Sequence, residues 1–239
     1  MEITYDNAYL FTGGYDGYLK QWETKSPHLK KDWGKVHSAG IWSMALTYKS
    51  NFLFTGDGGG QLKQWNVALE QLHKDWGVVH KSGIWSMCIS PNSKCLFLGD
   101  REGCLIQFSI DNQQTTRDFG KISDEWICSI VAGKYSSIVF IGGDGGGLKE
   151  IDLSKNGKQV VIFETKVHRD WVCSMAITPD GENLYIGGRD GNVKQWGVES
   201  RKIIRDLGCK NEDMILIMQT YGTGYGETGF DNGKENINM

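Results

Sequence analysis

Histidines and cysteines are the side chains of this chain with the most obvious chemistry, since both can ligate a metal and cysteine can act as a nucleophile. The histidines are His28, His37, His73, His80 and His168. A zinc site typically pairs such ligands at short spacing, as in Cys-x-x-Cys or His-Glu-x-x-His, and neither pattern occurs. His37, His80 and His168 fall in separate copies of a repeated segment. We therefore predict structural hydrogen bonding for them, and no metal.

The cysteines are also predicted to be structural. They are Cys88, Cys95, Cys104, Cys128, Cys173 and Cys209. Within the repeat, Cys128 and Cys173 stand where other copies carry Trp42 and Trp85, a position that suggests apolar packing. We expect reduced, buried thiols, as is usual in an intracellular protein.

Two glycine-rich runs, residues 56–60 and 142–147, resemble phosphate loops in composition. A phosphate loop leads into a helix whose N-terminus holds the anion, whereas both runs lead into strand-like segments. We interpret them as hairpin turns. No catalytic signature such as Gly-x-Ser-x-Gly occurs, so we predict a non-enzyme without a cofactor. The alternative is an enzyme that uses a channel mouth, although the sequence names no reaction.

The elements that would position these residues follow a repeat of about 43 residues. Residues 10–22 match residues 53–65 at 9 of 13 positions, and residues 32–44 match residues 75–87 at 10 of 13. Three further copies are more divergent but in phase. A period of this length without a helical pattern is typical of the blades of a β-propeller.

Each copy contains four strand-like runs separated by turns. In the second copy they cover residues 41–47, 52–55, 61–66 and 72–79. The first run is apolar on both faces, which is expected of the inner strand of a blade packed between neighbours. The fold class we predict is therefore all-β, a propeller of four-stranded antiparallel blades.

The number of runs predicts five blades in one domain, residues 1–220. The first copy lacks a recognisable first run, and the chain supplies an extra one at Met214–Met218. We expect this C-terminal strand to pair with the N-terminal blade and close the ring, which would remove open sheet edges. Residues 221–239 are rich in glycine and are predicted to be a flexible tail.

These residues resemble the WD-repeat (tryptophan–aspartate repeat) β-propeller family over roughly residues 8–218. The family carries a His before the first strand, an Asp in the turn between the second and third strands, and a Trp in the third strand. The matching residues here are His37, His80, His168, Asp16, Asp190, Trp22, Trp65 and Trp196. The second copy has Gly59 at the Asp position, so we expect the Trp–His–Asp hydrogen-bond network at most once, between His168 and Trp196.

The resemblance implies a rigid, non-catalytic scaffold for protein–protein contacts. Within it, Trp42 and Trp85 follow the Ile of the first strand, whereas Trp126 and Trp171 precede it. We predict that the first two lie between blades and that the second two lie at the rim, where a charged neighbourhood would suit a binding hot spot. The candidate partner-binding residues are Asp124, Glu125, Trp126, Arg169, Asp170 and Trp171.

Composition limits the partners. The net charge is −3 and no basic stripe occurs, so we do not expect nucleic acid. No apolar run could span a bilayer and the first residues do not form a signal peptide, so we expect a cytoplasmic monomer that binds a protein or peptide, with no membrane contact.

Two alternatives stay open. Trp33, Trp76 and Phe119 recur in an Asp-aromatic-Gly motif on the outer strand, and exposed rings there could form a multivalent, lectin-like carbohydrate site. The chain could also be a fragment of a larger WD-repeat protein.

Overall fold

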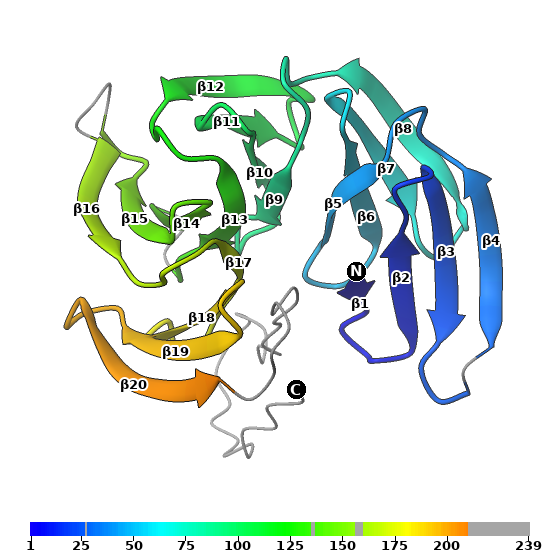
Figure 1. Ribbon diagram of the computed structural model, residues 1–239. Helices are drawn as coiled ribbons and strands as arrows, with labels where there is room; N and C mark the ends of the chain where they lie inside the picture. The colour runs from blue at the N-terminus through cyan, green and yellow to red at the C-terminus, as the bar shows by residue number, and fades with distance from the viewer. Residues whose placement is uncertain (27, 135–136, 156–159, 210–239) are drawn as a thin grey trace.

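The computed structural model describes residues 1–26, 28–134, 137–155 and 160–209. These residues form twenty β-strands and no α-helix, arranged as five four-stranded antiparallel sheets (Figure 1). The predicted five-bladed, all-β propeller is confirmed. No helix in the described part of the chain has the length and apolar character needed to cross a membrane.

Each sheet is built from consecutive strands in chain order. The first blade contains β1 (Glu2–Ile3), β2 (Tyr9–Gly13), β3 (Tyr18–Glu23) and β4 (Leu29–Lys35). The second contains β5 (Ile41–Leu46), β6 (Phe52–Asp57), β7 (Gln61–Asn66) and β8 (Gln71–Val78). The third contains β9 (Ser86–Ile89), β10 (Cys95–Gly99), β11 (Cys104–Ser109) and β12 (Gln114–Lys121).

The fourth blade contains β13 (Ile127–Ala132), β14 (Ile138–Gly143), β15 (Gly147–Asp152) and β16 (Val161–Lys166). The fifth contains β17 (Val172–Ile177), β18 (Asn183–Gly188), β19 (Asn192–Gly197) and β20 (Lys202–Cys209). In Figure 1 the blades follow an arc in chain order, with the first and fifth blades at its two ends and β5, β9, β13 and β17 on its inner side.

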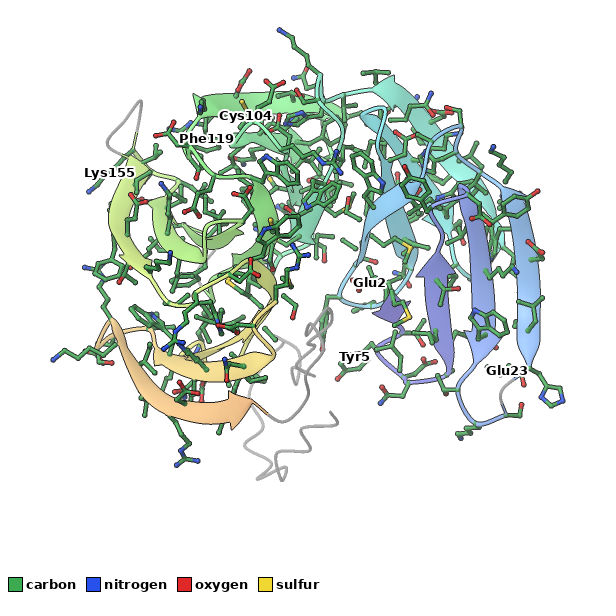
Figure 2. The ribbon with its side chains drawn as sticks, viewed as in Figure 1. Glu2, Tyr5, Glu23, Cys104, Phe119 and Lys155 are labelled. Atoms are coloured by element: carbon green, nitrogen blue, oxygen red, sulfur yellow. The ribbon has the colours of Figure 1, made fainter. Side chains whose placement is uncertain are left out.

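The hydrophobic core lies between blades. Each of four clusters of buried side chains combines residues from two consecutive blades; Phe54 and Leu62 of the second blade, for example, pack with Leu96 and Phe108 of the third. Side chains fill the space between neighbouring sheets (Figure 2). Both faces of the inner sheets are therefore buried, which explains the absence of polar alternation in their first strands.

A recurring serine joins the inner strands. The Oγ of Ser43 donates to the carbonyl oxygen of Ile84 at 3.0 Å, and the Oγ of Ser86 donates to that of Ile127 at 2.8 Å. Each bond links one blade to the next. The serine of the repeat therefore reflects an inter-blade contact that periodicity alone does not explain.

Aromatic residues join the outer parts of the blades. Trp33 of β4 packs edge-on against Trp65 of β7, with ring centroids 5.5 Å apart, and Trp76 of β8 packs against Phe108 of β11 at 5.1 Å. Phe119, labelled in Figure 2, packs against the cluster between the third and fourth blades. All three rings are half-buried and contact neighbouring side chains, as a cover over the blade edge would. The lectin-like alternative stays a prediction.

The first blade differs from expectation. Its inner strand is β1, in which Glu2 pairs with Phe11 and Ile3 with Leu10 of β2. A two-residue strand carries no detectable alternation, so the sequence pattern missed it. The predicted closing strand, Met214–Met218, and the predicted tail, residues 221–239, lie outside the described residues.

Candidate functional site

Four tryptophans form a continuous array across the second to fifth blades. They are Trp42, Trp85, Trp126 and Trp171, each at the starting end of an inner strand. Successive ring centroids are 4.7, 5.8 and 5.4 Å apart, all in edge-to-face geometry. All four are half-buried. The expectation that Trp42 and Trp85 are separated from Trp126 and Trp171 is therefore wrong.

The reason is the register of the repeat. Trp126 occupies the position of Gly40, and Cys128 occupies the position of Trp42, so the tryptophan moves by two residues between copies. Trp126 lies just before β13, whereas Trp42 lies within β5, where the pairing with β6 shifts between Ile41 and Ser43. The extra residue of such a bulge interrupts the strict alternation of strand faces, and both placements bring the indole into the same array.

Two glycines make room for the Trp42 indole. A Cβ on Gly58 would lie 2.6 Å from the Trp42 ring, and a Cβ on Gly83 would lie 3.1 Å from it. Gly83 also has a φ of +85°, a backbone conformation that favours glycine. The Trp42 indole is thus packed directly on the backbone of two loops.

Two arginines cover the array. The Cζ of Arg101, in the turn between β10 and β11, lies 4.6, 4.0 and 4.9 Å from the ring centroids of Trp42, Trp85 and Trp126. Arg189, at the matching turn of the fifth blade, lies 5.1 Å from the Trp171 ring. Both arginines are exposed. Sequence reasoning missed them because neither is part of a recognised motif.

The predicted acidic residues of this face mostly bind backbone amides. Glu125 accepts from the Gly147 amide at 3.3 Å, and Asp170 accepts from the Trp171 amide at 2.8 Å. Asp124 is fully exposed and forms an ion pair with Lys121 at 3.1 Å. Arg169 is exposed, and its amide donates to Asp190 at 3.3 Å. The six predicted residues lie in the loops before β13 and β17, where Trp126 and Trp171 belong to the array and the other four flank them.

The second blade brings the histidine, an acid and the tryptophan of the motif into one chain of contacts, contrary to expectation. His37 Nδ1 lies 3.1 Å from Asp57, and its Nε2 lies 2.7 Å from the Thr55 hydroxyl, to which the Trp65 indole donates at 3.0 Å. The acid is Asp57, two residues before the expected position at Gly59. The turn between β6 and β7 can bring residue 57 or residue 59 to the histidine. A search that assumed a fixed spacing between the acid and the tryptophan therefore missed Asp57.

The other motif residues vary. His168 Nδ1 pairs with Asp190 at 3.0 Å, and His80 Nδ1 pairs with Asp100 at 3.5 Å. Trp196 is buried. In the first blade, Trp22 donates to Thr12 at 2.9 Å, while the exposed Asp16 accepts from the Tyr18 amide at 3.1 Å. Asp16 therefore stabilises the turn between β2 and β3.

Burial controls the titratable groups near the array. Desolvation lowers the pKa of His37 and of His80, against the opposing attraction of Asp57 and Asp100. Desolvation raises the pKa of Cys173 to about 11 and that of Cys128 to about 12. Both thiols are protonated at neutral pH, so neither is an activated nucleophile. All five cysteines with described side chains are free.

One cluster in the described residues has the composition of a metal site. Asp100, Glu102 and Cys104 place ligand atoms within 4.8 Å of one another at the start of β11, where Figure 2 labels Cys104. Asp100 Oδ1 accepts from the amides of Glu102 and Cys104 at 2.9 and 2.8 Å. Asp57 makes the same two bonds in the second blade without such neighbours, so this acid shapes the turn in both blades.

The comparisons with known proteins agree with this geometry. The family described as WD domain, G-beta repeat (WD40) matches residues 1–23, 33–66, 77–109 and 151–197, more than half of the chain. The chain belongs to the WD40 family. No curated protein matches it. The longest internal segment outside these matches, residues 110–150, includes Ser123, which stands where the second, third and fifth blades carry the motif histidine.

Proposed function

We propose that this WD40 propeller is a non-catalytic scaffold that binds a protein or peptide through the tryptophan array. The observation that carries the proposal is the continuous stack of four indoles, capped by two exposed arginines at one end of the inner strands. Tryptophan and arginine dominate the energetics of protein interfaces because they combine large apolar area with directional polar groups.

The array is well suited to binding because it is rigid before a partner arrives. Each indole is held by its neighbours and by an inner strand, so docking on it would cost little side-chain entropy. The rings keep part of their surface exposed, and the flanking acids are tied to backbone amides. The exposed ring surface and the fixed acids support a role in recognition. The proposed function needs no activated nucleophile.

The binding surface we propose is broader than the sequence indicated. Trp42, Trp85, Arg101 and Arg189 join Trp126 and Trp171 at its centre, with Asp124, Glu125, Arg169 and Asp170 around it. We also propose a cytoplasmic monomer that does not bind nucleic acid. The free cysteines and the net charge of −3 support this.

A displayed library of random peptides tests the function. We expect the purified chain to enrich peptides that change its tryptophan fluorescence, and we expect Trp126→Ala and Trp171→Ala to abolish their binding. The matched controls are Leu69→Ala and Ile204→Ala, which remove exposed apolar side chains from the β7–β8 turn and from β20. Circular dichroism would verify that all variants fold.

Equal binding by the array variants and the wild type would contradict the proposal. So would the failure of a well-folded chain to enrich any peptide.

A further inference from the structure

Arg101 and Arg189 carry donors that the described protein groups do not use. No hydrogen bond or ion pair from either guanidinium to another described residue is present; their described contacts are with indole rings. A guanidinium has five N–H donors and no acceptor. Stacking on a ring holds it in place while its edge stays free to bind an oxyanion.

Two acids in the turns between the second and third strands of the fourth and fifth blades bind other groups. Asp190 pairs with His168 and accepts from the Asn192 amide at 3.1 Å, and Asp144 accepts from the Trp126 amide at 3.0 Å. Glu102, next to Arg101, is exposed and makes no ion pair with it. These carboxylates direct their oxygens to other donors, and none of them forms an ion pair with either guanidinium in the described residues.

The two arginines occupy equivalent places in the repeat. Arg101 precedes Gly103 by two residues, and Arg189 precedes Gly191 by two, so both project from the same kind of turn on alternate blades. Arg101 contacts Trp126, Trp126 contacts Trp171, and Trp171 contacts Arg189. These contacts limit the separation of the guanidinium carbons to about 15 Å, which an extended chain spans in about four to five residues.

We propose that the partner is an acidic peptide segment, an inference that rests on the proposed function. Two of its carboxylates, within about five residues of each other, pair with Arg101 and Arg189, while the apolar residues between them pack on Trp126 and Trp171. Charge-assisted bidentate pairs would fix the register of the segment, and the indoles would supply apolar contact area.

Fluorescence anisotropy with synthetic peptides tests this. The probe is a labelled peptide with two glutamates four residues apart and apolar residues between them. The comparison peptides replace both glutamates by glutamine or by phosphoserine. We expect the glutamate peptide to bind at least tenfold more tightly than the glutamine peptide, and binding to weaken as salt increases. Preference for the phosphoserine peptide alone would overturn the carboxylate assignment.

The variants are Arg101→Met and Arg189→Met, which keep much of the apolar stem. Each should weaken binding of the glutamate peptide at least tenfold. Arg205 is an exposed arginine on β20, and Arg205→Met should leave the affinity unchanged. Arg101→Lys should keep part of the affinity that Arg101→Met loses, because the charge is kept but the bidentate edge is lost.

The displayed library separates this inference from the proposed function. Peptides that bind the array without acidic enrichment, and that tolerate both methionine variants, would overturn the inference and leave the scaffold function intact. If no peptide requires Trp126 or Trp171, both proposals fail.

Discussion

The second and third blades build the tryptophan array in one way, and the fourth and fifth blades build it in another. In each of these four blades, an Ile or Val is flanked by two positions, one of which holds the indole while the other holds a small residue. The pairs are Gly40 with Trp42, Gly83 with Trp85, Trp126 with Cys128, and Trp171 with Cys173.

This difference shows that each of these four blades has room for one indole at the starting end of its inner strand. The rings meet in edge-to-face contacts in either arrangement. The small residue that accompanies the indole is constrained differently in the two arrangements. Gly83 needs its positive φ, whereas the protonated thiols of Cys128 and Cys173 occupy half-buried positions without such a backbone requirement.

The largest expected effect comes from breaking the first arrangement. Gly83→Ala should lower the free energy of unfolding by about 3 kcal/mol, because left-handed strain and overpacking each cost roughly 1–3 kcal/mol. The added Cβ would lie 2.7 Å from the Gly58 carbonyl oxygen. Urea denaturation measures the change. Cys173→Ala, at the small position of the fifth blade, is the control, and an equal loss in both variants would contradict the comparison.

The middle of the array should matter more than its end. Trp85 contacts Trp42, Trp126 and Arg101, whereas Trp171 has one described ring neighbour, Trp126. At roughly 1 kcal/mol for each aromatic pair, loss of the ring pairs should cost about 2 kcal/mol in Trp85→Ala and about 1 kcal/mol in Trp171→Ala. Thermal and urea denaturation of the two variants measures these losses. Equal losses of stability in the two variants would contradict a continuous array.

Exchanging the two arrangements should be tolerated. The double variant Trp126→Gly with Cys128→Trp gives the fourth blade the pattern of the second, and we expect a loss of about 1 kcal/mol, as for other swaps that conserve volume. Cys128→Trp alone places two indoles in one blade and should cost more. A double variant less stable than this single variant would show that the two positions are not equivalent.

The smallest expected effect is a difference in pH dependence. The loops of the second and third blades contain His37 and His80, whose pKa values burial lowers. As the pH falls below about 6.5, the unfolded chain binds protons that these folded histidines resist, so stability should fall until the folded pKa values are reached.

Urea midpoints at pH 7.5 and pH 5.5 measure this dependence. The variants His37→Gln and His80→Gln together should flatten it. The fourth blade has Ser123 at this position and should contribute nothing, so Ser123→Ala is the control. A dependence that the double histidine variant leaves unchanged would assign the effect to other groups.

Much of the fold could be predicted because the repeat carries it directly. The spacing of Trp22 and Trp65, the serine of four inner strands and the glycine turns define the blades without knowledge of contacts. The strand β1 could not be predicted, since two residues show no periodicity. The acid that binds His37 was misplaced because turn geometry, not spacing, decides whether residue 57 or residue 59 reaches the ring.

The sequence by itself determined the fold class and the number of blades, because these follow from local patterns that repeat in phase. It proposed Trp126 and Trp171 as candidate binding residues from the charges beside them. Tertiary structure alone decided that four tryptophans form one array and that Arg101 spans three of them. Those contacts join residues from different blades, and the distance between such residues depends on how the sheets pack around their common centre.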